Sequence, residues 1–491
     1  MEYKKINNNI ISEFSEFLNK DQIISDEKNK LQYSKDETED LVYLPELVLI
    51  PKNTEEISKI LQISNKHIIP VTVRGTGTGL SGGALPVCGG IVLSMEKFNK
   101  IINIDTDNFQ ITVEPFVINY DIQTVVKEKG LFYPPDPANY KNCSIGGNIA
   151  ENSGGPKAVK YGTTKDYVLS LEVVLANGDI IHTGRNLIKD VAGYNLTQLF
   201  VGSEGTLGII TKATLKLLPE VKENILMLIS FSTVEDAGKS VNTILKTGII
   251  PSSLEFMERN ALIISKEYAN LEYPPVNEST EAHLIVELDG NDYEKLLQER
   301  EIITKAVAVN NPEFIISANS EDEKEKIWQL RRNTGLAVGD KDVYKEQDIS
   351  IPRSNIPKAV NFINNWCEKY GYTAACYGHA GDGNIHANIL RSSVSDDIWN
   401  NKLKLHLTEL FDYICNTLDG SVTGEHGIGF VQRDFLPVMI DKTTINVMKS
   451  IKHLFDPNNI INPDKIFLKD QFIKKCNRLF CLFFYFSKKY L

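Results

Sequence analysis

The sequence predicts an α+β protein of two domains, on three observations. The chain has 491 residues, enough for two or three domains at roughly 150 residues each. Short apolar strands and amphipathic helices alternate from Pro45 onward. A strand-rich run over 206–218 then closes at Pro219, where we place the boundary between the two domains.

The composition excludes several classes of protein. Hydrophobic residues make up 42% and charged residues 24%, as in ordinary soluble globular proteins. A formal net charge of -11 argues against a nucleic-acid binder, which needs a basic surface. The seven cysteines form no C-x-x-C pair, which favours reduced thiols in a cytoplasmic protein. We expect neither a signal peptide, because residues 1–9 are polar, nor a spanning helix of ~20 apolar residues.

The pattern of the first half of the chain predicts short strands and few helices. Residues 1–40 are charged and predicted to be helical. A helix should run from Thr54 to about Lys66, with Thr54 as its N-cap and acidic residues in its first turn. Asn177-Gly178 between two apolar runs predicts a β-hairpin. The other expected elements are strands at 46–50, 69–73, 91–94, 101–105, 110–114, 171–175 and 180–182, and a helix at 120–129.

The second half alternates helix and strand. This rhythm predicts helices packed on an antiparallel sheet. Helical patterns near the end of the chain complete the second domain. The expected helices are 234–246, 293–307, 397–417 and 443–455, and the expected strands are 283–288 and 314–318.

A glycine-rich loop, 74–83, follows the strand at 69–73 directly. Gly75-x-Gly77-x-Gly79 is not a Rossmann fingerprint, because Leu80 comes next and a strand follows in place of a helix. It is not a phosphate-binding P-loop either, since this loop contains no Gly-Lys-Ser/Thr. Its unhindered backbone N–H groups can still bind a pyrophosphate. Taken alone, such a loop fits a flexible surface turn equally well.

A second glycine-dense segment favours the binding interpretation. Pro134-Pro135-Asp136-Pro137 precedes Ser144-Ile145-Gly146-Gly147-Asn148-Ile149-Ala150-Glu151-Asn152-Ser153-Gly154-Gly155. Each glycine segment lies beside predicted strands. Together they suggest one extended ligand that runs between the two segments.

Four segments together resemble a known family. Residues 74–86, 134–155, 161–167 and 200–210 are similar to the vanillyl-alcohol-oxidase-type flavoproteins, above all the group of glycolate oxidase D subunits and FAD-linked D-lactate and D-2-hydroxyglutarate dehydrogenases. The resemblance spans roughly 40–467. It implies a two-subdomain FAD-binding domain, followed by an α+β substrate (cap) domain with an antiparallel sheet and a C-terminal helical segment. The expected divisions are 1–40, 41–219, 220–467 and 468–491.

The resemblance also implies how FAD is held. The pyrophosphate would lie over 75–80 and the body of the cofactor along 144–155. Some relatives attach the flavin to a histidine near the first loop, and this loop has none, so we expect non-covalent FAD. For Asn462, the Asn-Pro step could instead simply end a helix. The implied FAD contacts are Arg74, Gly75, Thr76, Gly77, Thr78, Gly79, Leu80, Gly83, Pro135, Asp136, Ser144, Ile145, Gly146, Asn148, Asn152, Gly154, Gly155, Tyr161, Gly162, Glu204, Ile209 and Asn462.

Three histidines, His379, His386 and His426, lie close together in the sequence. The Asp382-Gly383 step predicts a chain reversal that returns His379 toward His386. On an extended segment, His386 and Asn388 point to the same face. Two histidines and a carboxylate suit zinc, iron or manganese. The alternative is that these histidines cap turns or pack in a core.

The resemblance assigns roles to this cluster. His379, His386 and Glu425 match metal ligands, and His426 matches the catalytic base. Asn388, Arg331 and Lys345 match substrate-binding residues, with Arg331 expected on the substrate carboxylate. Arg332 is the immediate neighbour of Arg331 and competes for that role. Taken alone, each of these cations would more often be a solvated surface charge.

The function implied is FAD-dependent oxidation of a small 2-hydroxy acid, glycolate or D-lactate, to the 2-oxo acid by hydride transfer to flavin. Partner redox subunits or a respiratory acceptor would then take the electrons. Alternatives with the same fold are D-2-hydroxyglutarate or another D-2-hydroxy acid as substrate, or an ether-lipid synthase activity. A different class of function is a non-catalytic flavin-carrying subunit. We expect a cytoplasmic location, with peripheral contact to the inner face of a membrane as a further hypothesis.

That membrane hypothesis rests on the segment 468–491, an atypical basic and aromatic tail. Its apolar run, 479–486, is far too short to span a bilayer. Basic residues around an aromatic cluster could instead rest on an anionic surface, at ~1 kcal/mol per cation. The alternative is an extension without function. The cations are Lys469, Lys474, Lys475, Arg478, Lys488 and Lys489, against the single acid Asp470.

Overall fold

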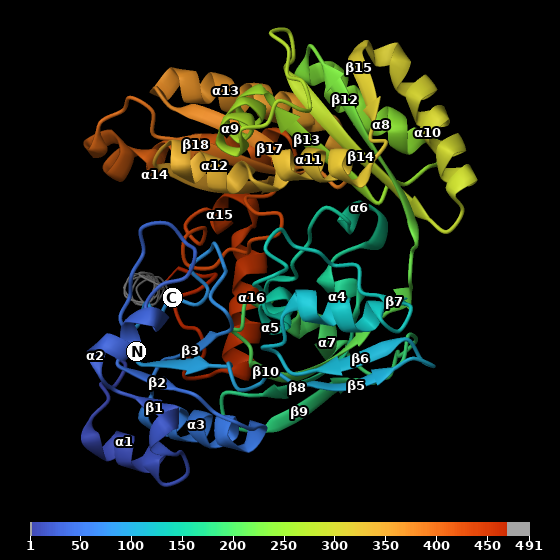
Figure 1. Cartoon of the computed structure of the whole chain (residues 1–491). Helices are drawn as coiled ribbons and strands as arrows, with labels where there is room; N and C mark the ends of the chain where they lie inside the picture. The colour runs from blue at the N-terminus through green and yellow to red at the C-terminus, as the bar shows by residue number, and fades with distance from the viewer. Residues whose placement is uncertain (1, 469–491) are drawn as a thin grey trace, which may run out of the picture.

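The computed structural model describes residues 2–468, so the basic aromatic tail lies outside the described residues. Figure 1 shows a large sheet with its helices above two smaller sheets. The red helix α16 (Lys442–Phe455) returns from the far end of the chain and runs between the two smaller sheets. The C-terminal segment therefore packs on the part of the molecule that the N-terminal half of the chain forms.

The first small sheet has the order β1-β2-β4-β3, and β2, β4 and β3 are parallel. Helix α3 (Thr54–His67) follows β2, and its predicted N-cap is wrong by one residue. Asn53 caps the helix: its backbone is extended and its side chain accepts a hydrogen bond from the Glu56 N–H, while Thr54 is already helical. The strands are β1 (Ile23–Ile24), β2 (Leu47–Leu49), β3 (Val71–Arg74) and β4 (Ile91–Ser94).

The second small sheet is antiparallel, in the order β5-β6-β10-β8-β9. Strands β8 and β9 form the hairpin that Asn177-Gly178 predicted, with Gly178 at a φ of 88°. One face is apolar and is covered by helices α4 (Asn119–Lys127), α5 (Ile145–Glu151) and α7 (Leu196–Phe200). The strands are β5 (Ile101–Asp105), β6 (Gln110–Val113), β8 (Val168–Val174), β9 (Ile180–Gly184) and β10 (Ile209–Lys216).

The third sheet has seven strands in the order β15-β12-β14-β13-β17-β18-β16. Every pairing in it is antiparallel, which confirms the predicted antiparallel sheet. The strands are β12 (Glu223–Phe231), β13 (Ser253–Glu258), β14 (Ala282–Gly290), β15 (Pro312–Ser317), β16 (Tyr344–Ser350), β17 (Thr373–His379) and β18 (Asn384–Leu390).

Helices cover both faces of this sheet. On one face, with α13 (Ile356–Tyr370) at the top of Figure 1, α13 closes a large apolar core together with α8 (Val234–Lys246), α10 (Tyr293–Val307) and α14 (Asp396–Asp412). On the other, lower face, where Figure 1 shows α11 (Glu321–Arg332) and α12 (Thr334–Lys341), these two helices and α9 (Arg259–Ala269) close a smaller one. Part of the lower face instead carries polar side chains, and this part faces the two small sheets.

The N-terminal region is helical only in part, which corrects the prediction for 1–40. It forms α1 (Asn8–Ser15), α2 (Glu27–Lys30) and two 3-10 turns, but β1 pairs with β2 as a strand. Two short elements, β7 (Leu131–Phe132) and β11 (Leu218–Pro219), pair with each other, and α6 (Ala158–Tyr161) and α15 (Leu436–Met439) complete the helices. Within 2–468, no helix combines the length and apolarity needed to cross a membrane.

Candidate active site

Two neighbouring strands, β17 and β18, place the first two histidines. The predicted reversal at Asp382-Gly383 is present, with Gly383 at a φ of 90°. The hairpin pairs His379 with Asn384 and Tyr377 with His386, so the two histidine rings lie 5.5 Å apart between centroids. Because side chains alternate along strands, His379, His386 and Asn388 all lie on the lower, polar face of the sheet.

The three predicted metal ligands converge. Glu425 Oε1 lies 3.2 Å from His379 Nε2 and 3.4 Å from His386 Nε2. One ligand atom from each residue falls within 4.8 Å of the others. Two imidazole nitrogens and a carboxylate oxygen are a donor set suited to zinc, iron or manganese. The residues therefore fit a divalent ion, and the identity of that ion stays a prediction.

Glu255, which the sequence analysis missed, orients His379. It lies on β13 with a side chain that is 0% exposed, and its two oxygens are 2.8 and 2.9 Å from His379 Nδ1. Arg331 donates to the same carboxylate at 2.8 Å. With Nδ1–H donating to Glu255, the lone pair of Nε2 is directed at Glu425, which is the arrangement that prepares a histidine for a metal.

The charges of this cluster depend on one another. Burial alone would lower the pKa of His379, but Glu255 and Glu425 raise it well above its usual value. Burial would raise the pKa of Glu425, yet His379 and His386 hold it well below its usual range. The space between the carboxylates and the imidazoles thus favours positive charge. A divalent cation provides that charge without protonated histidines.

A backbone loop, 423–429, presents Glu425 and His426 to the sheet. Asp348 Oδ2 on β16 accepts backbone N–H groups from Gly424, Glu425 and His426 at 2.8, 2.8 and 2.9 Å. It also accepts the Thr423 hydroxyl at 2.9 Å. A single buried carboxylate therefore fixes the course of the loop that carries the third ligand and the predicted base. Sequence reasoning missed Asp348 too.

His426 lies beside the three predicted metal ligands. Its ring stacks on His386 with 5.3 Å between centroids and an interplanar angle of 23°. Its side chain is 21% exposed, more than those of His379 and His386. Glu346, His386 and His426 form a second group whose ligand atoms lie within 4.8 Å, so the cluster offers an alternative cation position. The base role of His426 stays a prediction.

Arg331 and Asn388, two of the predicted substrate-binding residues, also lie at the cluster. The Arg331 guanidinium is buried 4.8 Å from the ring centroid of Tyr377. Arg332 instead forms an exposed ion pair with Glu325, so its position does not suit a buried carboxylate. Asn388 donates to the Tyr377 hydroxyl at 3.0 Å, and its side-chain oxygen is buried without a partner among the described residues. That oxygen is available to a ligand.

Lys345, the third predicted substrate-binding residue, is not brought to the histidines. Its Nζ lies 3.3 Å from Asp40 Oδ2 and 3.3 Å from the Glu39 carbonyl oxygen. Alternation along β16 sets Lys345 on the other side of the strand from Glu346 and Asp348, which face the cluster. Its substrate role stays a prediction that this geometry does not favour.

The two glycine segments pack against each other. A side chain at Gly75 would collide with Ser144 Oγ, and one at Gly155 would lie 2.6 Å from the Asp136 carbonyl oxygen. At Gly154 an added carbon would lie 2.9 Å from Glu425 Oε2. The second glycine segment therefore borders the predicted metal ligands. A flavin along this segment would lie next to the histidines.

Glu204 and Asn462 connect the glycine segments to the end of the chain. Glu204 accepts the backbone N–H groups of Ile428 and Gly429 at 2.8 and 2.6 Å, at the end of the loop 423–429. Asn462 donates to the Glu204 carbonyl oxygen at 2.9 Å, and its own oxygen accepts the Val73 N–H at 3.3 Å. Both predicted FAD contacts thus hold the loops together, whether or not they touch the cofactor.

Several buried polar atoms near the glycine segments have no partner within 2–468, and they are Ser81 Oγ, Asn148 Nδ2 and Glu151 Oε2. Such atoms are costly unless a ligand or water satisfies them. Together with the alternate glycines Gly75, Gly77 and Gly79, they fit an extended polar cofactor. Two other predicted contacts are otherwise occupied: the Tyr161 hydroxyl donates to Asp289 at 2.7 Å, and Ile209 packs in an apolar core.

Comparison with known proteins agrees with this geometry. A family model described as "FAD binding domain" matches residues 45–184, and one described as "FAD linked oxidases, C-terminal domain" matches residues 220–466. The chain is 41% identical over 442 residues to the glycolate oxidase subunit GlcD of Bacillus subtilis (strain 168), covering 90% of this chain and 93% of that protein. It is 33% identical over 479 residues to a D-lactate dehydrogenase of Anaerostipes hadrus, covering 95% and 99%.

A solved structure of p-cresol methylhydroxylase with substrate bound shares the fold. The TM-score is 0.79 at 19% identity, and the match covers 94% of this chain and 96% of that one. The predicted fold class, a vanillyl-alcohol-oxidase-type FAD-binding domain followed by an α+β domain, is therefore confirmed. On these matches, the chain belongs to the FAD-linked oxidase family.

Proposed function

We propose that this protein oxidises a small 2-hydroxy acid, glycolate or D-lactate, to the 2-oxo acid with FAD as the hydride acceptor. One observation carries the proposal: His379, His386 and Glu425 converge beside His426, at the point where Gly154 of the second glycine segment borders the cluster. The relatives named glycolate oxidase subunit and D-lactate dehydrogenase support the substrate class.

Each side chain at the cluster has a separate role in such an oxidation. The reaction removes a proton from the hydroxyl and a hydride from C2. His426 accepts the proton, as imidazoles commonly do in enzymes. Arg331 binds the substrate carboxylate through its planar, forked guanidinium, with Glu255 and Tyr377 fixing its position. When bound, a divalent ion supplies Lewis-acid polarisation of the hydroxyl and the flavin supplies hydride acceptance.

The finer features of the site are also proposals. The divalent ion, zinc, iron or manganese, is held by His379, His386 and Glu425, with Glu255 orienting the first of them. Asn388 contacts the substrate through its unpartnered oxygen. The relatives named as subunits support partner redox subunits as electron acceptors. We further propose a cytoplasmic location, with the segment 468–491 adding affinity for an anionic membrane surface.

The cofactor is expected to be bound without a covalent link. The first glycine segment, 74–83, contains no histidine. The purified protein should therefore be yellow and should release intact FAD on denaturation without proteolysis. The supernatant and pellet of heat- or acid-denatured protein are compared by absorbance and fluorescence. Flavin that stays with the pellet would contradict non-covalent binding, and a protein that neither contains nor takes up FAD would contradict the cofactor itself.

The substrate class is tested by dye-linked turnover with a panel of acids. Glycolate, both lactate enantiomers and D-2-hydroxyglutarate are compared at equal flavin concentration. The proposal predicts the highest kcat/KM for glycolate or D-lactate. A higher kcat/KM for D-2-hydroxyglutarate would instead support a D-2-hydroxyglutarate dehydrogenase, the alternative with the same fold. Flavin-loaded protein that turns over none of the acids would favour a non-catalytic flavin-carrying subunit.

A further inference from the structure

Far from the histidine cluster, the second small sheet ends in an open edge. β9 is the last strand of the order β5-β6-β10-β8-β9 and, among the described strands, pairs on one side only, with β8. The loop 185–195 follows it and leads to α7. Open edge strands tend to recruit another strand unless something covers them. We name β9, this loop and the hollow beside them the edge surface.

The loop exposes large apolar side chains. Ile188 is 79% exposed, Val191 98% and Tyr194 96%. The base of the loop is held in place, because the Asn186 carbonyl oxygen accepts from Gln110 at 3.0 Å. A loop with a fixed base that presents several apolar side chains to water is typical of a contact surface.

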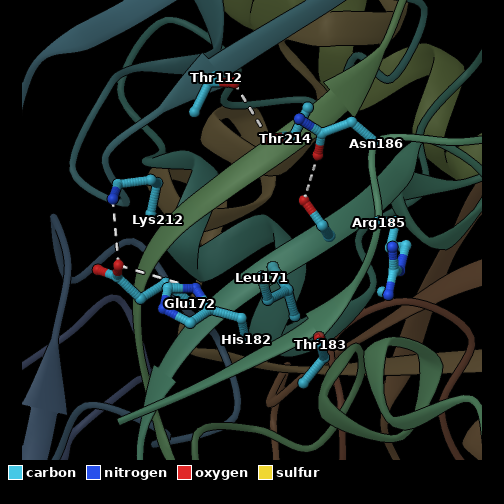
Figure 2. A pocket seen from close by; sticks show the side chains of 11 residues that line it. Thr112, Leu171, Glu172, His182, Thr183, Arg185, Asn186, Lys212 and Thr214 are labelled. Carbon is cyan, nitrogen blue, oxygen red and sulfur yellow. Dashed lines mark hydrogen bonds and ion pairs between the residues drawn. The ribbon is translucent and has the colours of Figure 1, made fainter.

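A hollow of about 410 Å³ opens beside the base of this loop, on the sheet face turned away from the apolar core. Figure 2 shows its side chains, which belong to β6, β8, β9 and β10 and to the start of the loop. Apart from Leu171 they are polar, and they carry both charges, as in the ion pair between Lys212 and Glu172 at 3.1 Å. The protruding loop and the hollow thus lie next to each other on one surface.

The charge of the edge surface favours a second copy of this chain over an acidic partner or a lipid surface. The chain carries a net charge of -11, so two copies repel each other over most of their surface. Residues 180–195 contain Arg185, Lys189 and Asp190 as their only Lys, Arg, Asp or Glu side chains, a net of two minus one, or +1. A nearly neutral patch reduces this repulsion, whereas binding to anionic lipid needs several cations.

The symmetry of an antiparallel edge strand also favours a second copy of this chain as the partner. An antiparallel edge strand can pair with its own copy about a two-fold axis, which satisfies both edges with one strand type. A protruding loop next to a hollow is also self-complementary about such an axis. We propose that two copies of this chain form a dimer through the edge surface, with β9 beside β9 and the loop of each copy, Tyr194 included, against the hollow of the other.

The first test measures the mass of the full FAD-loaded chain by light scattering and sedimentation over a range of concentrations. A dimer of twice the 55.1 kDa mass of one chain is expected. The double variant Val191→Asp/Tyr194→Asp should raise the dimer dissociation constant at least 100-fold. Val309→Asp, at an apolar position 75% exposed in the other half of the chain, is the matched control and should leave the dimer unchanged.

A charge variant separates self-association from other partners. Asp190→Lys brings the segment to +3 and sets like charges against each other across the two-fold axis. It should raise the dissociation constant about tenfold at low salt, and ~0.5 M salt should reverse most of the change because it screens exposed charges. Flavin content and dye-linked turnover should stay unchanged in every variant. These two measurements check that each variant is folded.

Three outcomes would overturn the proposal. They are a mass of one chain at every concentration, a double variant that keeps the dimer mass, and tighter association in Asp190→Lys. The last result would indicate that the segment contacts an acidic surface of the other copy, because the chain carries a net charge of -11. None of these outcomes depends on which acid the protein oxidises.

Discussion

Replacing His426 with alanine is expected to lower kcat by a factor on the order of 10²–10⁴, with FAD content unchanged. The loss is the usual cost of removing a general base. The backbone of the loop should survive the change, because Asp348 holds it through the N–H groups of Gly424, Glu425 and residue 426 and none of these bonds involves the imidazole. The loss would therefore report the side chain itself.

The measurement for His426→Ala is dye-linked turnover per flavin, with the flavin spectrum as a check on the fold. His453→Ala is the matched control, since that histidine is exposed on α16 and is not one of the cluster residues described above. Turnover within about threefold of the parent in His426→Ala would remove this residue from the role of base, because a missing general base costs more than that.

Replacing Glu425 with glutamine is expected to abolish both metal binding and turnover. The substitution removes a carboxylate that faces the Nε2 atoms of both His379 and His386. Loss of an orienting partner alone costs about 10–100-fold in metal affinity, and loss of a ligand should cost more. Metal content by elemental analysis after dialysis, and metal titration of the chelated protein, measure the effect.

Two further variants locate the ion within the cluster. Glu255→Gln should weaken metal binding about 10–100-fold, since Glu255 orients His379 without facing the ligand position. Glu346→Gln should weaken metal binding less, because Glu346 lies 3.2 Å from Nδ1 of His386, on the side of the ring opposite Glu425. If the ion is lost in Glu346→Gln but kept in Glu425→Gln, the ion is bound among Glu346, His386 and His426 instead.

Much of the fold could be predicted because its signals are local. Helices α8 and α10 begin and end at the predicted residues, since Thr233 and Asp292 cap them and their apolar spacing is regular. The β8-β9 hairpin follows from Asn177-Gly178 in the same way. The N-terminal region was predicted less well, because β1 forms only through pairing with β2, which lies beyond helix α2 in the chain.

The candidate site was predictable only where its residues carried a motif. The glycines around His379, His386 and Glu425 marked them, and the structure brings all three together. Glu255 and Asp348 had no such signal, since each is a carboxylate within a strand whose partners lie far away in the sequence. Lys345 is a different case: the family resemblance alone suggested it, and strand alternation turns its side chain away from the cluster, so its substrate role stays a prediction.

The most direct test of the proposed function is anaerobic mixing of the FAD-loaded protein with each hydroxy acid while the flavin absorbance is followed. Hydride transfer to flavin bleaches its visible absorption without any electron acceptor, so the result does not depend on a partner or a dye. We predict rapid bleaching by glycolate or D-lactate in the metal-loaded protein, and slow bleaching in His426→Ala. A flavin that none of these acids reduces in metal-loaded protein would contradict the proposed function.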